Sequence, residues 1–454
     1  MPGSVVLSIL EGPLTGQTFD FDCCDIFLFG RAANCHLCLP DDPFVSSYHC
    51  IMVIEPPDVR IRDLGSLNGT YVNGKKQGGR RPEQSSIQGR RLVFPEVLLK
   101  DGDMVQVGRT RFVVSIQTPP RSTMVIRCVS CKAPIAGSRD VMDAGDWLCS
   151  RCQRKASENP QHFLRTMLHQ GLTVRGYRTG EQLADYKLEE RLAEGGMGFV
   201  HLARSKVDGS RVVLKVLHSE LAASEHNRKS FLREMMVLRK LEHPNVVQYK
   251  DYGDVGNTFF FVMEYCNRGT LEEMAAGQAG PLPWDRVAPL MLDVLRGLDY
   301  AHRRGIVHRD LKPGNVFLHD GGNGTAAKVG DFGLAKSFQR AGLSRMTVVG
   351  EYAGTYNFMA REQLTNFKYA KPACDVWSTG ATFYHLLTQE FPRTAVPERD
   401  PIDVVLEDQI VPIQKRGVDV PRAVAKVINR SLSSDLERRY PAAGDMLHAL
   451  EKVL

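Results

Sequence analysis

The sequence predicts a multidomain chain with an all-β sandwich, a short segment held by cysteine pairs, and a larger α+β domain. Short apolar runs alternate with turn dipeptides over residues 1–118, and two cysteine pairs, each with a two-residue gap, lie within 121–155. Residues 185–454 begin with strand patterns and continue with helical ones, and Val287, Met291, Val294, Leu295 and Leu298 recur at helical spacing just ahead of the stretch 308–315. Residues 156–184 are mixed polar and are expected to form a linker. A chain of 454 residues agrees with about three domains, because single cores rarely exceed ~150–250 residues.

The composition is that of a globular protein, with 43% hydrophobic and 24% charged residues. No apolar stretch approaches the ~18 residues that span a bilayer, and the first apolar run, at 5–10, is too short for a signal peptide. The cysteines outside the pairs show no disulfide framework, which favours a reducing compartment. We therefore expect a cytoplasmic protein without a membrane span.

One segment supplies most of the net charge of +6. Residues 75–91 carry +5, from six basic residues (Lys75, Lys76, Arg80, Arg81, Arg90, Arg91) less one Glu83. We favour a solvated hairpin loop over an anion or nucleic-acid patch. The segment has no interleaved aromatic residues for stacking on bases, so nucleic acid is not an expected partner.

The first 118 residues show the alternation of a β-sandwich. The turn signals Asn68-Gly69, Asn73-Gly74 and Asp101-Gly102 separate the apolar runs. The sequence predicts strands at 5–10, 26–29, 49–54, 59–61, 104–107 and 111–116.

The two cysteine pairs predict a structural zinc site. Cys128 and Cys131 are followed after 17 residues by Cys149 and Cys152, and two such knuckles complete a tetrahedral Zn²⁺ site with no open position. The segment resembles a zinc ribbon, and redox disulfides are the alternative. Cys35 and Cys38 share the two-residue gap, but side chains three apart on a strand point to opposite faces, so we expect core cysteines there.

The stretch 308–315, His-Arg-Asp-Leu-Lys-Pro-Gly-Asn, and the later Asp331-Phe332-Gly333 are suited to phosphoryl transfer. Asp310 can orient an attacking hydroxyl and accept its proton, and Lys312 can neutralise charge on the moving phosphate. Asn315 and Asp331 offer oxygen ligands to Mg²⁺.

These residues belong to an ordered set that resembles the eukaryotic-like, bacterial-type serine/threonine protein kinases over residues 186–454. The resemblance implies a two-lobed α+β domain that uses ATP with Mg²⁺ or Mn²⁺ to phosphorylate protein substrates. Lys312, two residues after Asp310, resembles the serine/threonine-specific subclass. Lys215 would bind the phosphates and Glu234 would form an ion pair with it. The glycine-rich loop would be Gly195, Gly196, Gly198 and Val200, and the adenine-contacting segment Met263, Glu264 and Cys266.

The resemblance also implies regulation and internal bracing. Arg309 before Asp310 resembles kinases switched by phosphorylation, for which Thr347 and Ser344 are the candidate acceptors. His308 and Phe332 are expected to pack. Asp375 would brace the catalytic loop, Glu362 would pair with Arg439, and Thr355 resembles a structural threonine near the substrate site.

Two positions depart from the kinase pattern. Ala193 replaces the first loop glycine, and Arg361 interrupts the Ala-Pro-Glu position. If Ala193 needed a left-handed backbone, the cost would be only ~1–2 kcal/mol. Neither change removes a catalytic atom, so we favour an active enzyme. A pseudokinase scaffold that binds phosphoproteins without catalysis is the alternative.

The N-terminal part resembles a forkhead-associated domain, through Gly30-Arg31, the run at 46–49 and Asn68-Gly69-Thr70. Such domains bind phosphothreonine, and the resemblance implies that Arg31, Ser46, Ser47 and Asn68 contact the phosphopeptide. His49 would brace the loops. The ligand would be a phosphorylated substrate or a phosphorylated segment of this chain.

Overall fold

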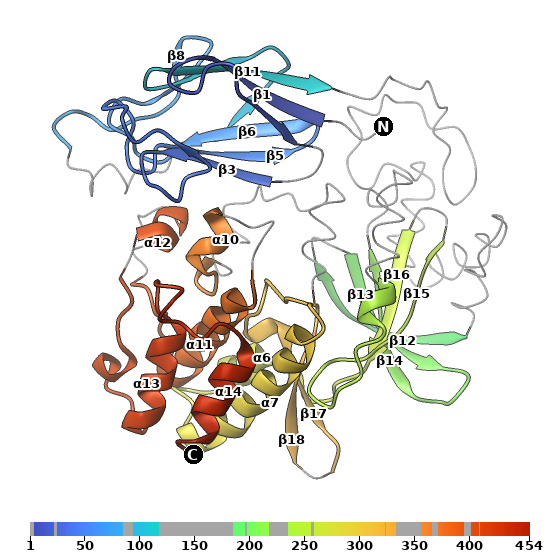
Figure 1. Cartoon of the computed structure of the whole chain (residues 1–454). Helices are drawn as coiled ribbons and strands as arrows, with labels where there is room; N and C mark the ends of the chain where they lie inside the picture. The colour runs from blue at the N-terminus through green and yellow to red at the C-terminus, as the bar shows by residue number, and fades with distance from the viewer. Residues whose placement is uncertain are drawn as a thin grey trace. The chain divides into compact units, whose positions relative to one another are not determined.

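The computed structural model describes residues 4–21, 25–84, 94–117, 185–195, 198–217, 235–255, 258–322, 324–332, 356–365, 371–394, 401–407 and 409–454. Figure 1 labels their main helices and strands. They fall into two compact units. The first comprises Met1–Pro119, His243–Val246 and Cys266–Leu454, and the second Pro120–Glu242 and Val247–Tyr265. The segment with the paired cysteines lies outside the described residues.

The N-terminal part of the first unit is a sandwich of two mainly antiparallel sheets. The six-stranded sheet runs in the order β2 (Thr18–Phe21), β1 (Ser4–Glu11), β11 (Thr110–Gln117), β10 (Met104–Val107), β7 (Thr70–Val72) and β8 (Lys75–Lys76). The five-stranded sheet runs β4 (Leu37–Cys38), β3 (Asp25–Gly30), β5 (Cys50–Glu55), β6 (Asp58–Asp63) and β9 (Val97–Leu99).

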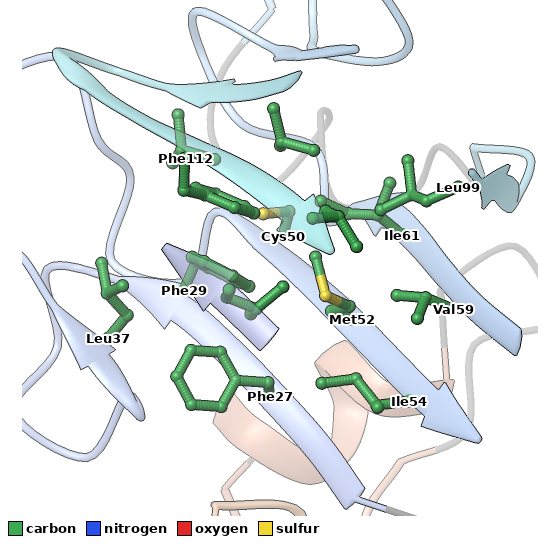
Figure 2. Packing of buried hydrophobic residues seen from close by; sticks show 14 of the residues in the cluster. Phe27, Phe29, Leu37, Cys50, Met52, Ile54, Val59, Ile61, Leu99 and Phe112 are labelled. Carbon is green, nitrogen blue, oxygen red and sulfur yellow. The ribbon is translucent and has the colours of Figure 1, made fainter. Parts of the chain in front are cut away.

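Alternating side chains from both sheets form the sandwich core (Figure 2). On β1, Val5, Leu7 and Ile9 are buried at 2% exposure or less, and the residues between them are half-buried. The rings of Phe29 on β3 and Phe112 on β11 stack with centroids 5.1 Å apart, so they join the two sheets directly. This core holds the loops at the sandwich edge in place.

The second unit contains a five-stranded antiparallel sheet. Its order is β12 (Tyr186–Gly195), β13 (Gly198–Ser205), β14 (Arg211–Leu217), β16 (Thr258–Glu264) and β15 (Tyr249–Val255). A small cluster that includes Leu214, Phe260 and Val262 packs on one face. Two irregularities in register bend β12 before it turns into β13.

Helices dominate the C-terminal part of the first unit. α7 (Trp284–His302) contacts α11 (Pro372–Thr388), α14 (Ala443–Glu451) and the hairpin of β17 (Val316–Asp320) and β18 (Thr325–Val329) through β18. The remaining elements are α6 (Leu271–Ala276), η2 (Pro313–Asn315), α10 (Arg361–Thr365), α12 (Pro401–Glu407), η4 (Ile413–Arg416) and α13 (Arg422–Ser431). α11 is buried along nearly its whole length, so it forms the centre of this part.

The strands and the helix predicted from periodicity are confirmed. Each of the six predicted strands is present, with ends that differ by at most two residues. The helical spacing ahead of the catalytic loop corresponds to α7, where Val287, Met291, Val294 and Leu298 are fully buried. Within the described residues no helix combines the length and apolar character needed to cross a membrane.

The geometric reason for excluding a metal at Cys35 and Cys38 was wrong in part. Only Cys38 lies on a strand, β4, because Cys35 is in the preceding bend. The expected burial holds for Cys35, while Cys38 is half-buried. Burial, with a further contribution from Cys38, raises the pKa of the Cys35 thiol to about 12. Metal ligation needs the thiolate, so Cys35 is poorly suited to it.

Candidate active site

The candidate catalytic loop, residues 308–315 between α7 and β17, is held by the carboxylate of Asp375, the fourth residue of α11. This side chain is fully buried. It accepts hydrogen bonds from the backbone amides of His308 (2.7 Å) and Arg309 (2.8 Å) and from Nε2 of His302 (2.8 Å). The predicted brace is therefore confirmed. It also holds Arg309 at a φ of 67°, a left-handed conformation that non-glycine residues rarely adopt.

The surroundings of Asp375 keep it ionised. Burial alone would raise the pKa of its carboxyl group. The hydrogen bond from His302 and the neighbouring imidazoles and amide outweigh burial, so the pKa lies below its usual value. A buried anion is thus paired with several donors, as its desolvation requires.

His308 connects the catalytic loop to the strand that leads to Asp331. Its Nδ1 accepts a hydrogen bond from the amide of Asp310 at 3.2 Å, and its Nε2 donates to the carbonyl of Gly330 at 2.7 Å. The ring is buried, with its centroid 4.9 Å from that of Phe332. The predicted packing role of both residues is confirmed, because neither nitrogen of His308 is left for chemistry.

Asp310, Lys312 and Asn315 form one cluster. Nζ of Lys312 lies 3.7 Å from Oδ2 of Asp310, and their side chains are 32% and 25% exposed. Nδ2 of Asn315 donates to the carbonyl of Asp310 at 2.6 Å and to its Oδ2 at 3.1 Å. Asp310 is therefore positioned by its neighbours and remains accessible to a substrate hydroxyl.

Asn315 and Asp331 are brought together by the backbone. The amide of Gly330 donates to the carbonyl of Asn315 at 2.9 Å, and Asp331 follows with a φ of 55°. Since Nδ2 of Asn315 faces Asp310, its amide oxygen is left as the acceptor of this side chain. An amide oxygen and a carboxylate are the hard ligands that Mg²⁺ prefers, so these residues fit the ion.

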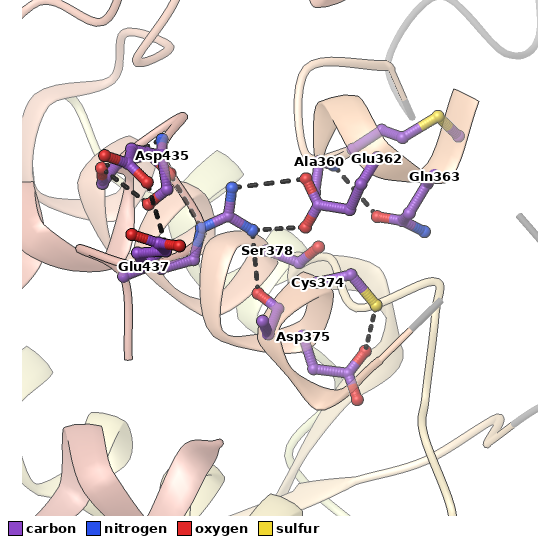
Figure 3. Close-up of polar contacts among 12 residues, drawn as sticks. Ala360, Glu362, Gln363, Cys374, Asp375, Ser378, Asp435 and Glu437 are labelled. Carbon is purple, nitrogen blue, oxygen red and sulfur yellow. Dashed lines mark hydrogen bonds and ion pairs between the residues drawn. The ribbon is translucent and has the colours of Figure 1, made fainter. Parts of the chain in front are cut away.

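A buried ion pair joins α10 to the segment between α13 and α14. Arg439, whose side chain has no exposed area, forms hydrogen bonds through both terminal nitrogens with the carboxylate of Glu362 (Figure 3). It also donates to the carbonyls of Ala373 (3.0 Å) and Ser433 (2.8 Å). The predicted pair is confirmed. Next to it on α10, Gln363 donates to the carbonyl of Arg309 at 2.7 Å and so ties this helix to the catalytic loop.

In the second unit, the candidate nucleotide residues lie on adjacent strands. Val200 on β13 is opposite Lys215 on β14, and Val213 is opposite Met263 on β16. Nζ of Lys215 lies 5.7 Å from the ring centroid of Phe261. Met263 is only 4% exposed. Ala193 is a residue of β12 without positive φ, so the strain considered for alanine is absent.

The candidate phosphopeptide residues lie on neighbouring loops of the sandwich. Arg31 and Ser47 are exposed and Ser46 is half-buried. The amide of Arg31 donates to the carbonyl of Ser46 at 3.0 Å, and the amide of Leu67 donates to Oγ of Ser46 at 3.2 Å. Nδ2 of Asn68 donates to the carbonyl of Phe44 at 2.8 Å. The fold thus brings together three loops that are distant in the sequence.

Two buried side chains fix these loops. Nδ1 of His49 accepts from the amide of Ser46 at 3.2 Å, and its Nε2 lies 3.1 Å from the carbonyl of Gly69. Burial lowers the pKa of His49, which favours the neutral ring that this pattern needs. The bracing role expected for His49 is confirmed. Asp63 accepts from the amides of Gly65 (2.9 Å) and Ser66 (2.8 Å) and from the hydroxyl of Thr70 (2.8 Å).

Sequence reasoning missed Asp63 and Gln363. Asp63 is followed two residues later by a glycine, a pattern typical of a turn in which a carboxylate accepts backbone amides, so a signal was available. Gln363 offered no signal, because its partner lies 54 residues away. Several predicted site residues lie outside the described part of the chain: Glu234, Gly196, Thr347, Ser344, Thr355, Cys128, Cys131, Cys149 and Cys152.

Comparison with known protein families identifies the class. The family model described as "Protein kinase domain" matches residues 186–449, which is more than half of the chain. The chain therefore belongs to the protein kinase family. The model of the FHA, or forkhead-associated, domain matches residues 27–108, within the sandwich.

Several curated relatives are bacterial serine/threonine kinases. Pkn2 of Myxococcus xanthus is 30% identical over 267 residues, 58% of this chain and 32% of that protein. PknB of Mycolicibacterium smegmatis is 32% identical over 281 residues, 61% of this chain and 44% of that protein. The chain thus spans less than half the length of either relative. The PknI kinase domain of Mycobacterium tuberculosis aligns with a TM-score of 0.46 and 24% identity, over 60% of this chain and 97% of that one.

Proposed function

We propose that this chain is a serine/threonine protein kinase that transfers the γ-phosphate of ATP to protein hydroxyls. The observation that carries the proposal is the cluster in which Asn315 and Lys312 position the accessible carboxylate of Asp310. The curated kinases described above support it. The pseudokinase alternative has no specific support, since the described catalytic residues keep their functional groups.

The residues of the cluster have separate roles in phosphoryl transfer. Asp310 would orient the substrate hydroxyl and take its proton, and Lys312 would balance the charge that develops on the transferred phosphate. Asn315 and Asp331 would hold Mg²⁺, which when bound neutralises charge on the nucleotide phosphates. Lys215, paired with Glu234, would hold the α and β phosphates beneath the loop that contains Gly195 and Gly198.

The other nucleotide contacts follow from the same assignment. Backbone groups of Glu264 and Cys266 would bind the adenine edge, with Met263 beside it and Val200 and Gly196 above. Cys266 is 9% exposed, so its thiol would pack while its backbone binds.

Arg309 supports regulation by phosphorylation. Its Nε is buried and makes no hydrogen bond with the residues that the structure describes. A phosphate on Thr347 or Ser344 would supply strong acceptor oxygens and a charge of about −1.5 to −2. Such a pairing would order the segment beside the catalytic loop.

The sandwich would read phosphothreonine. Arg31 offers a guanidinium fork, Ser46 and Ser47 offer hydroxyls, and Asn68 would contact the peptide backbone. The exposure of Arg31 and Ser47 leaves them accessible to a ligand. The bound partner would be a phosphorylated substrate, recruited for catalysis, or a phosphorylated segment of this chain. The cysteine quartet, Cys128, Cys131, Cys149 and Cys152, would bind a structural Zn²⁺ between the two modules.

Incubation of the purified, zinc-loaded chain with labelled ATP and Mg²⁺ tests the proposal. We expect autophosphorylation on serine or threonine, and its loss in Asp310→Asn. Asp419→Asn, which alters an exposed carboxylate outside the site, is the matched control and should stay active. If wild-type and Asp310→Asn proteins incorporate equal amounts of label, or neither labels itself or any offered polypeptide, the proposed activity is wrong.

A further inference from the structure

The five-stranded sheet of the sandwich buries both of its faces at β3 and β5. Phe27, Phe29 and Met52 point into the sandwich core. Ile26, Leu28 and Ile51 lie between them in the strand alternation, on the opposite face, and are 7%, 0% and 2% exposed. An antiparallel sheet in a sandwich usually leaves its outer face in water, so something covers this one.

The cover is provided by two helices of the same compact unit. Leu364 of α10 and Ile402, Val405 and Leu406 of α12 form one buried hydrophobic cluster with these outer-face residues. On α12 these three positions are separated by three and four residues, counted from Ile402, which places them on one face of the helix. The outer sheet face and this helix face are therefore complementary apolar surfaces.

The sheet side of this cluster borders the candidate phosphopeptide loops. Ala32 and Tyr48 pack against the cluster and are adjacent in sequence to Arg31 and Ser47. The buried Cys35 belongs to the cluster and its thiol donates to the carbonyl of Ser47 at 3.5 Å. The cluster that packs against α10 and α12 therefore also includes residues next to, or hydrogen-bonded to, the candidate phosphopeptide loops.

The helix side of the cluster leads to the catalytic loop. Met359, which packs against the cluster, accepts a hydrogen bond at its carbonyl from Arg393 (2.8 Å). Gln363, one residue before the clustered Leu364, donates to the carbonyl of Arg309 next to Asp310 (2.7 Å). A continuous set of packed and hydrogen-bonded residues therefore joins the candidate phosphopeptide loops, through Leu364 and Gln363, to Asp310.

We propose that this contact fixes the phosphothreonine site relative to Asp310, so that the preferred substrates are polypeptides that already carry phosphothreonine at a set spacing from the acceptor hydroxyl. The inference rests on the proposed kinase function and narrows its substrate class. A reader on a free linker would accept many spacings, because a flexible tether samples many distances. A reader docked through a buried apolar cluster accepts only spacers that bridge the two sites.

A peptide series tests this substrate class. Each peptide carries one phosphothreonine and one acceptor serine, separated by glycine-serine spacers of increasing length, and kcat/KM is measured against the same peptide with unmodified threonine. With the wild-type chain we expect kcat/KM to peak at one spacing, at least ~10-fold above the unphosphorylated peptide, and to fall for shorter spacers. Leu406→Glu should flatten this dependence on spacer length while leaving phosphorylation of the unmodified peptide in place.

Two controls separate docking from misfolding. Leu98→Glu changes a side chain of β9 that is 54% exposed and should keep the wild-type profile. Val405→Ala removes only part of the cluster, and faster hydrogen exchange in β3 and α12 of this variant should accompany a broader spacing profile. If Leu406→Glu does not fold, the milder variant carries the test.

The outcomes distinguish the fixed geometry of the two sites from the kinase assignment. The fixed geometry is wrong if phosphothreonine enhances kcat/KM equally at all spacings. It is also wrong if the spacing peak is unchanged in Leu406→Glu and Val405→Ala. In both cases the kinase assignment still holds. Absence of any enhancement overturns the fixed geometry as well. Failure of the wild-type chain to phosphorylate any peptide overturns the kinase assignment itself.

Discussion

The amide of Arg309 donates to the carboxylate of Asp375, 66 residues further along the chain, at 2.8 Å. The bond links the residue before the candidate catalytic aspartate to the start of the most buried helix of its unit. The geometry of Asp310 therefore depends on a side chain that takes no part in the chemistry. This dependence can be measured.

Asp375→Asn should lower activity far more than it lowers stability. The amide keeps the shape of the carboxylate but directs a donor toward the donors of His302, His308 or Arg309. One unsatisfied buried group costs about 1–3 kcal/mol, which urea unfolding would detect. We expect kcat to fall at least ~10-fold because the loop is misplaced. Ser378→Ala, which removes a nearby buried hydrogen bond to the Phe358 carbonyl, is the control and should lose stability with little loss of kcat.

The Glu362–Arg439 pair should dominate the stability of the helical part. Removal of one member of a buried pair costs about 3–5 kcal/mol because the other charge loses its partner. Arg439→Met should therefore lower the midpoint of thermal unfolding markedly. Arg438→Met, which removes the neighbouring arginine with a side chain 82% exposed, should change it little. A small effect of Arg439→Met would show that the pair contributes less than its burial indicates.

His36 should make the sandwich sensitive to mild acid. Its Nδ1 accepts from the amide of Leu28 at 2.9 Å, and burial lowers its pKa to about 4. Because the unfolded chain binds a proton at the ordinary value near ~6.5, stability contributed by neutral His36 falls as the pH drops from about 6.5 towards about 4. Denaturant unfolding across this range should show the decline, and His36→Gln should reduce it. An equal slope in the variant would exclude His36 as the cause.

Arg31→Ala should weaken phosphopeptide binding without unfolding the sandwich. The residue is exposed, so its loss removes a phosphate contact and little packing. We expect the affinity for a fluorescent phosphothreonine peptide to fall at least ~10-fold, since charge-assisted bonds contribute ~1.5–3 kcal/mol. Arg81→Ala, at another exposed site of the same sandwich, should bind as the wild type does. Unchanged binding by Arg31→Ala would remove Arg31 from the proposed reader.

Local sequence patterns predicted those parts of the fold that depend on local periodicity. The long strands of the sandwich and α7 repeat with the periods of their geometry, so their positions could be read directly. β4 and β8 have two residues each and β7 has three, which is too short for a period to be visible. Their pairing is imposed by neighbours that are distant in the sequence.

The features of the candidate site likewise divide into those that the sequence predicted and those that required the folded chain. Asp310, Lys312, Asn315 and Asp331 could be proposed because motif order reflects chemistry. The effect of Ala193 could not be predicted from the sequence, since it depends on the backbone of β12. In that strand Ala193 does not adopt a left-handed conformation. The tie from Gln363 to Arg309 required the folded chain, as did the cover on the outer face of β3.

That covered face has a consequence for how such a gene can be divided or recombined. If the first 118 residues were expressed alone, Ile26, Leu28 and Ile51 would meet water and favour aggregation. In the other fragment, the apolar face of α12 would also be exposed to water. The two modules would therefore be inherited as a pair, with a change on one side selecting for a compensating change on the other.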